Sequence, residues 1–161
     1  MSKEHVIEFV LEVYQINKQT KQHIEYLLDP NEKEMLEKYR KIIIEEFYPT
    51  KGSSDPKLRF AVCKKAIAEF KSLKPAPENL ADLLVTLSET TCEFIGDFSS
   101  IWEEFYDSTA TNFIVALKYL EKNGLLEPFE KRCAKCVKHV ASTGYGFEDS
   151  MGDIYSEYYK K

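Results

Sequence analysis

The stretch that decides the fold class is residues 77–97, which read PENLADLLVTLSETTCEFIGD. The positions expected to face a core recur every three or four residues, as a helix requires. They are Leu80, Leu83, Leu84, Leu87, Thr91, Phe94 and Ile95. Pro77 suits the first turn of a helix, and Gly96 favours its end. The stretch therefore predicts one long amphipathic helix that ends near Asp97.

The same periodicity recurs on both sides of this stretch, in segments separated by helix-breaking residues. The breakers lie at Pro30, Pro49, Pro77, Gly124 and the 144–146 turn. Signals for strands are nearly absent, since no Asn-Gly or Asp-Gly pair joins two alternating runs. The sequence therefore predicts an all-α protein of seven or eight helices.

Two asparagines refine the number of helices expected at the N-terminal end. The apolar pattern lapses after Asn17, so we expect the first helix to break there, although a single helix to Leu28 is the alternative. Asn31 followed by Glu34 has the form of a capping box, which predicts a new helix just after Pro30.

Short loops between helices favour antiparallel neighbours, so the expected unit is the helical hairpin. The segments that begin at Ala61 and Ala110 look alike, which loosely suggests tetratricopeptide-like stacking. No fixed period near 34 residues accompanies the likeness. An irregular helical bundle and a short array of helical hairpins therefore fit the sequence equally well.

Length and composition predict a single domain over residues 1–161. Of the residues, 43% are hydrophobic and 30% are charged, which is ordinary for a globular protein. We expect no membrane span, because no run of 18 apolar residues occurs, and no signal peptide. Four cysteines without a secretory leader are most simply reduced thiols, so the predicted compartment is the cytoplasm.

The charge distribution is uneven along the chain. The formal net charge is −5, which disfavours a nucleic-acid partner. Residues 75–117 contain no Lys or Arg but carry eight carboxylates. A solvated acidic surface is the simplest interpretation of such a run. The sharper hypothesis is a docking surface for a basic protein, a basic peptide or a cation.

One cysteine motif invites a metal or redox interpretation. Cys133 and Cys136 are three residues apart, and His139 follows after three more. Structural zinc usually needs a second ligand pair, and Cys63 and Cys92 lie on separate predicted helices. We therefore expect these cysteines to pack in the core as small apolar side chains.

The turn at residues 144–153, GYGFEDSMGD, is the most unusual stretch. Glycines on both sides of Tyr145 permit a left-handed backbone, and Phe147 opens the next predicted helix. Glu148 and Asp149 would lie in the first turn, and Asp149 shares a helix face with Asp153. The stretch is either a tight turn with an acidic helix start, or a site for a divalent cation or basic partner.

A second acidic group lies at residues 97–107. It combines the carboxylates Asp97, Glu103, Glu104 and Asp107 with the aromatic residues Phe98, Trp102, Phe105 and Tyr106. Carboxylates that converge in a cleft perform acid–base chemistry or hold metals, and aromatic neighbours suit a cationic peptide. The alternative is a helix start whose aromatic side chains fill the core.

Four short motifs carry a resemblance that spans most of the chain. They are Asp29-Pro30-Asn31-Glu32, the Ala61–Leu73 helix with Lys64-Lys65-Ala66-Ile67, Phe105-Tyr106 with Ser108, and Gly144-Tyr145-Gly146-Phe147 leading to Asp153-Ile154-Tyr155. The chain resembles a family of short bacterial proteins known only as a domain of unknown function. The resemblance implies a bacterial, cytosolic, all-helical protein and carries no activity.

The sequence favours a non-enzymatic helical module that binds a basic protein or peptide through its acidic, aromatic C-terminal half. It predicts no cofactor, no nucleic-acid partner and no membrane partner. The alternative is a carboxylate-based enzyme that depends on a divalent metal. The predicted binding residues are Asp97, Trp102, Glu103, Asp107, Tyr145, Phe147, Glu148, Asp149 and Asp153. Whether residues 97–107 and 148–153 meet in one cleft is left open.

Overall fold

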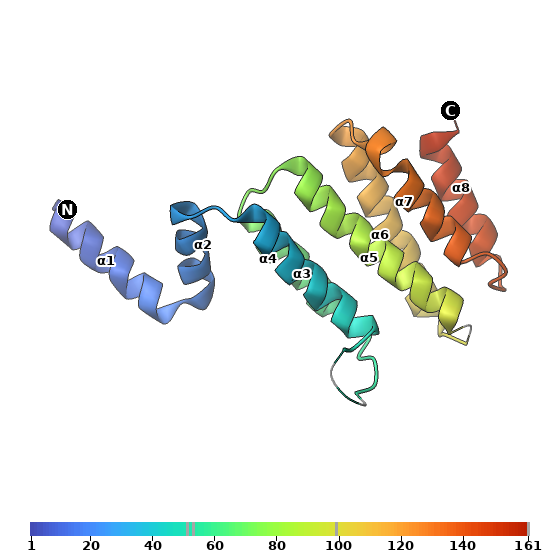
Figure 1. Ribbon diagram of the computed structural model, residues 1–161, viewed down its shortest axis with the longest axis horizontal. Helices are drawn as coiled ribbons and strands as arrows, with labels where there is room; N and C mark the ends of the chain where they lie inside the picture. Colours follow the sequence, from blue (N-terminus) through green and yellow to red (C-terminus); the bar gives the residue numbers. More distant parts are fainter. Residues whose placement is uncertain (51, 53, 99, 161) are drawn as a thin grey trace.

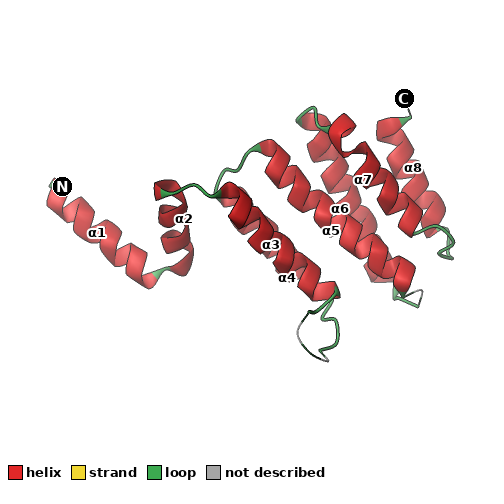
Figure 2. Cartoon of the chain, viewed as in Figure 1, coloured by secondary structure: helices red, strands yellow, loops and turns green. Residues whose placement is uncertain are grey.

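The structure is a computed structural model that describes residues 1–50, 52, 54–98 and 100–160. These residues form eight α-helices and no strand, which confirms the all-α prediction (Figure 2). The helices are α1 (Lys3–Ile16), α2 (Lys18–Leu28), α3 (Glu32–Phe47), α4 (Phe60–Ser72), α5 (Pro77–Asp97), α6 (Glu103–Lys122), α7 (Leu126–His139) and α8 (Phe147–Tyr159). No helix in this described part of the chain is long and apolar enough to cross a membrane.

Six of the helices pair into three stacked hairpins, α3–α4, α5–α6 and α7–α8 (Figure 1). The first members, α3, α5 and α7, lie side by side in one layer, and α4, α6 and α8 form the layer behind them. The architecture is therefore the short array of helical hairpins, one of the two arrangements that the sequence left open. We call residues 32–159 the array.

The helix α5 lies at the centre of the array and contacts α3, α4, α6 and α7. Thirteen of its 21 residues are buried, and four of these are Thr or Ser. Their hydroxyls donate to backbone carbonyls one turn earlier, for example Thr90 Oγ1 to Thr86 O at 2.7 Å. The bonds satisfy the polar groups of a helix that contacts neighbours on nearly every side.

Local capping sets the helix boundaries at the N-terminal end. Asn17 ends α1 and caps α2, where its side chain accepts a hydrogen bond from Thr20 N at 3.0 Å. Asn31 accepts from Glu34 N at 3.2 Å and donates to the Glu34 carboxylate at 2.8 Å. Both the predicted break at Asn17 and the predicted cap at Asn31 are confirmed.

The N-terminal hairpin, residues 3–28, stands apart from the array (Figure 1). The helix α1 packs against α2, and Tyr14 donates a hydrogen bond to Glu25 at 2.7 Å. Side-chain bonds from Gln22 to Tyr39 and from Tyr26 to Glu32 connect α2 with α3. All residues of both helices are described, and none of them is buried.

The four cysteines are free and buried in the core, as their packing interpretation predicts. Burial raises the pKa of Cys63 and of Cys133 to about 12 in each case. Thiols of this kind are poor nucleophiles, because the thiolate is the reactive species.

Candidate functional site

A groove of about 600 Å³ lies where the N-terminal ends of α6 and α8 meet. We call it the α6–α8 groove. It is lined by Ile101, Glu103, Tyr106, Asp107, Tyr145, Gly146, Phe147 and Ser150. Four of these eight residues belong to the predicted binding set. The groove therefore joins part of the first acidic group with part of the unusual turn.

The α6 side of the groove supplies two carboxylates and an aromatic ring. Trp102 is the N-cap of α6 in an extended backbone conformation, so the helix begins at Glu103. Glu103 and Asp107 are one turn apart and therefore share a face of the helix. Phe105 points into the core and Tyr106 into the groove. The aromatic side chain that fills the core and the side chains that line the groove thus occupy different faces of α6.

The α8 side of the groove begins with a left-handed turn. Tyr145 has φ +64° and Gly146 has φ +74°, and Gly146 is the N-cap of α8. A left-handed backbone costs a residue with a β-carbon about 1–2 kcal/mol. Tyr145 adopts it while its side chain is fully exposed to solvent. A strained backbone that displays an aromatic ring marks a candidate contact position.

Phe147 forms the floor of the groove rather than its rim. Its side chain is buried, and its ring meets the ring of Tyr106 edge-on at 4.8 Å between centroids. Such an edge-to-face pair contributes about 1 kcal/mol beyond the buried area. Phe147 therefore holds the N-terminal ends of α6 and α8 together, and Tyr106 and Tyr145 are the rings that a ligand can reach.

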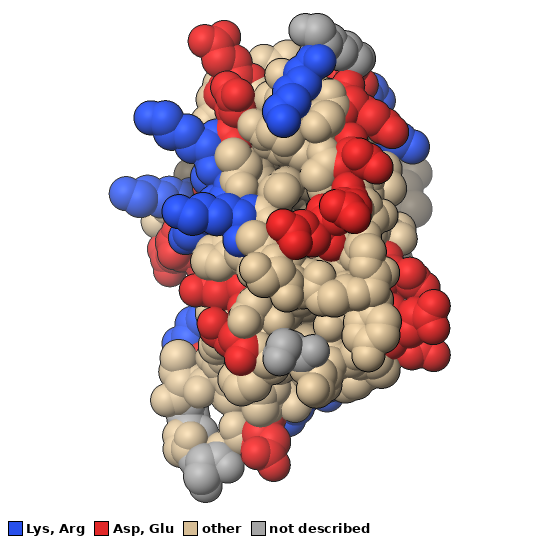
Figure 3. Space-filling model, turned by 90° about the vertical axis from the view of Figure 1, so that its right-hand side faces the viewer, with Lys and Arg blue, Asp and Glu red and all other residues tan. Residues whose placement is uncertain are grey.

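The groove is electronegative. Glu103 and Asp107 are exposed, and no basic side chain among the described residues forms an ion pair with either. Figure 3 shows the end of the molecule that α8 closes, where carboxylates border an uncharged area, while Lys and Arg lie mostly along one edge and near the top. An uncompensated negative potential beside aromatic faces attracts cations.

The remaining predicted residues do not converge on this groove. Glu148 accepts a hydrogen bond from the backbone N–H of Ser142 at 2.8 Å and so ties the turn to α8. Asp149 and Asp153 line a second surface groove, shared with α7. The two acidic groups therefore meet only in part. Tyr145, just before α8, and Phe147, its first residue, lie in the groove with α6, whereas Asp149 and Asp153 line the groove with α7.

Asp97 and Trp102 also lie outside the groove lining. Asp97 accepts a hydrogen bond from the hydroxyl of Tyr48 at 2.7 Å, and burial together with this bond raises the pKa of Tyr48. Asp97 also borders a cleft with Lys135, Lys138 and His139. Trp102 is about half exposed and meets Phe105 edge-on at 5.7 Å.

The carboxylates of the metal-dependent alternative are divided between two grooves. Within the described residues, no group of three His, Cys, Asp or Glu side chains is placed to hold a metal ion. Glu148, Asp149 and Asp153 line one groove shared with α7, whereas Glu103 and Asp107 line the α6–α8 groove. The alternative that uses Glu148, Asp149 and Asp153 alone, without Glu103 and Asp107, stays a prediction.

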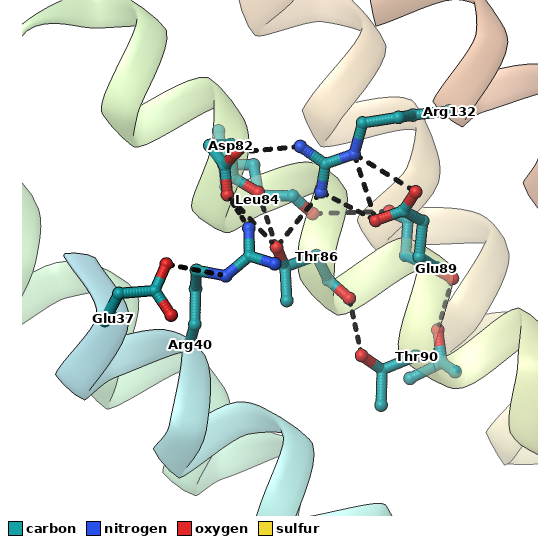
Figure 4. A network of polar contacts seen from close by, with 10 residues as sticks. Glu37, Arg40, Asp82, Leu84, Thr86, Glu89, Thr90 and Arg132 are labelled. Atoms are coloured by element: carbon teal, nitrogen blue, oxygen red, sulfur yellow. Dashed lines mark hydrogen bonds and ion pairs between the residues drawn. The ribbon is translucent and has the colours of Figure 1, made fainter. Parts of the chain in front are cut away.

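One polar cluster escaped the sequence analysis, namely an ion network across α3, α5 and α7 (Figure 4). Arg40 of α3 and Arg132 of α7 both bind Asp82 of α5. Arg132 also reaches Glu89 at 2.6 Å, and Thr86 at 3.2 Å. The signal was the spacing of Asp82, Thr86 and Glu89, which puts all three on one face of the central helix. Its partners lie more than forty positions away in the sequence.

A family model described as a family of unknown function, DUF6155, matches residues 1–158. The chain belongs to this family. Membership confirms the resemblance to an uncharacterised family and adds no activity for the DUF6155 chain. Neither a curated protein nor a solved structure matches the DUF6155 chain significantly.

Proposed function

We propose that the protein is a non-enzymatic interaction module that binds a basic protein or peptide segment in the α6–α8 groove. The observation that supports this most is the meeting of Glu103 and Asp107 with Tyr106 and Tyr145, from helices about forty residues apart. Two uncompensated carboxylates beside two accessible rings suit a Lys or Arg side chain better than a neutral or acidic group.

The recognition chemistry follows from the two kinds of side chain. A guanidinium or ammonium group placed over the Tyr145 or Tyr106 ring gains about 0.5–2 kcal/mol, depending on how far it is desolvated. A charge-assisted hydrogen bond to Asp107 or Glu103 adds a similar amount. The methylene stem of the same residue can cover the uncharged lining. One or two basic side chains of an extended peptide would fill a groove of about 600 Å³.

The experiment is a binding titration with a fluorescent peptide rich in Lys and Arg, set against the same peptide with Glu at those positions. We expect the basic peptide to bind and the acidic one not to. Asp107→Asn should weaken binding about tenfold and Tyr145→Ala about fivefold, as the loss of one charged contact and one cation–π contact predicts. Affinity should also fall as salt rises.

The matched control is Asp153→Asn, which removes the same charge from the far side of α8. Its affinity for the basic peptide should stay within about twofold of the wild-type value, because the substitution removes only a screened, longer-range interaction. If Asp107→Asn and Asp153→Asn weakened binding equally, the binding would depend on the overall charge of the protein and not on the α6–α8 groove. Absence of binding to the basic peptide at millimolar concentration would refute the proposal.

The proposal includes a bacterial cytoplasm as the place of action. The four free, buried thiols support it, since proteins of reducing compartments keep cysteines unpaired. Cell fractionation with an antibody against the native chain tests this, and recovery in an extracellular or membrane fraction would contradict it.

A further inference from the structure

The N-terminal hairpin carries an apolar surface that nothing in the described chain covers. In α1 the apolar side chains from Val6 to Ile16 occupy more than half of the helix circumference, and Glu4, Glu8 and Glu12 share the remaining stripe. A helix with so wide an apolar arc normally lies in a core. Yet none of the fourteen residues of α1, all described, is buried.

The exposed apolar side chains of the described residues concentrate in this hairpin. Nine of thirteen large ones lie within residues 1–28, and Phe9 is 62% exposed while Leu28 is 81% exposed. The eight from Val6 to Leu28 are each 42–81% exposed, so their combined area is comparable to the roughly 800 Å² that one partner contributes to a specific interface of standard size. A monomer rarely leaves so many large apolar side chains of one hairpin in water.

Charge disfavours two of the surfaces that could cover the hairpin. Helices that lie on anionic bilayers carry Lys and Arg beside their apolar face, whereas α1 carries one lysine, Lys3, and the three glutamates Glu4, Glu8 and Glu12. Docking of α1 into the α6–α8 groove of another copy would place these carboxylates against Glu103 and Asp107. Like charges at such a contact oppose binding.

The face of α1 is instead complementary to itself. Between Val6 and Ile16 its apolar arc contains no charged residue, so two copies related by a two-fold axis bring no like charges together. In α2, Leu27 and Leu28 are exposed as well. Two hairpins joined in this way make a four-helix unit with an apolar interior and glutamates on its outside.

We propose that the protein is a homodimer in which the N-terminal hairpins of two copies pack through the apolar face of α1. Each copy then presents its array, with its α6–α8 groove, away from the dimer axis. The dimer depends on the first 28 residues alone, and its formation does not require that the groove bind a basic partner.

Light scattering coupled to size-exclusion chromatography tests the proposal with the full chain at about 10–100 μM, where interfaces of this size associate. The wild type should have the mass of a dimer. Phe9→Glu places a charge in the apolar face and should shift the mass to a monomer. The matched control, Val115→Glu, changes a side chain of α6 that is 48% exposed and should stay dimeric.

Crosslinking locates the contact independently of how well any variant folds. The native cysteines are buried, so a new thiol on α1 reports on its own surroundings. Val10 lies near the middle of α1, where either a parallel or an antiparallel two-fold pairing brings it beside its copy. Mild oxidation of Val10→Cys should give a disulfide-linked dimer, and Glu8→Cys on the polar stripe should not.

Three outcomes would overturn the proposal. The first is a wild type that stays monomeric throughout this concentration range. The second is a monomer that co-sediments with anionic vesicles, which would assign the face to a membrane surface. The third is a dimer that survives Phe9→Glu and is lost in Val115→Glu, which would place the interface on the array.

Discussion

The helices α1 and α5 have similar apolar patterns in sequence, and the structure treats them in opposite ways. In α5 thirteen of 21 residues are buried, whereas α1 buries none of its fourteen. The helix α5 contacts four other helices of the array, and α1 packs against α2. The apolar pattern shows that a helix can be buried, and the stacking of neighbouring hairpins decides whether it is.

The contrast extends to the polar groups of the two helices. In α5 the buried hydroxyls bond to backbone carbonyls and the charges of Asp82 and Glu89 are paired with arginines. In α1 the glutamates form a continuous exposed stripe. A helix inside the array must satisfy every polar group it carries, while a helix at the edge can leave them to water.

The largest expected effect comes from deleting the same three side-chain carbons in each helix. Leu87→Ala should lower the free energy of unfolding by about 3 kcal/mol, because Leu87 is buried and its loss leaves a cavity. Leu11→Ala should lower it by less than about 1 kcal/mol, because Leu11 is 55% exposed. Urea unfolding at low protein concentration measures both. Equal losses would contradict the contrast between α1 and α5.

Two glycines sharpen the comparison inside the array. A β-carbon at Gly96 would lie 2.5 Å from the carbonyl oxygen of His139, so Gly96→Ala must push α5 and α7 apart. We expect Gly96→Ala to lower the free energy of unfolding by about 2 kcal/mol. Gly152 in α8 has nothing within 4 Å of such an atom, and Gly152→Ala should stabilise by about 0.5–1 kcal/mol through helix propensity. Thermal melting should give shifts of opposite sign.

The ion network allows a test of what holds α3, α5 and α7 together. Arg132→Ala leaves Asp82 and Glu89 partly buried with one cation fewer, which should cost about 1–2 kcal/mol. Lys135→Ala on the same helix removes an exposed cation and should cost less than about 0.5 kcal/mol. Chemical denaturation of the two variants measures the difference. A neutral Arg132→Ala would show that the network adds nothing to the stability of the array.

The smallest expected effect concerns the anchor of the loop that follows α3. Hydrogen bonds from the Arg59 side chain hold the pKa of Glu46 below its usual value of 4.5, despite the burial of the carboxyl. A lowered folded-state pKa stabilises the fold above the unfolded value, and this contribution is lost as pH falls through the folded value.

Glu46→Gln should therefore lower the free energy of unfolding by about 1 kcal/mol at neutral pH. As the pH falls from roughly 5 to 3, the stability of this variant should decrease less than that of the wild type. Unfolding curves across this range measure the slope. In the Glu46→Gln background, Arg59→Ala should have little further effect, because its partner charge is already gone. Parallel pH curves for the wild type and Glu46→Gln would rule out this role for Glu46.

The local sequence predicts the helices better than it predicts the candidate site. The breaks at Asn17, Gly124 and residues 144–146 follow from caps and left-handed turns, which depend on a few neighbouring residues. The α6–α8 groove needed the contact between two helices that the sequence does not pair. The sequence therefore leaves open whether Glu103 and Tyr145 meet, and it does not reveal that Asp149 and Asp153 line a different groove.

By itself, the sequence determined that this protein is helical, where its helices end, and that residues 75–117 are acidic. These properties depend on periodicity, on capping and on composition, all of which act over one or two turns of chain. Only the tertiary structure decided that α5 is central while α1 is uncovered, that Arg40 and Arg132 meet on Asp82, and that two acidic groups meet only in part. Each of these depends on which helix faces lie within a few ångströms of each other, and hairpin packing sets that across long stretches of sequence.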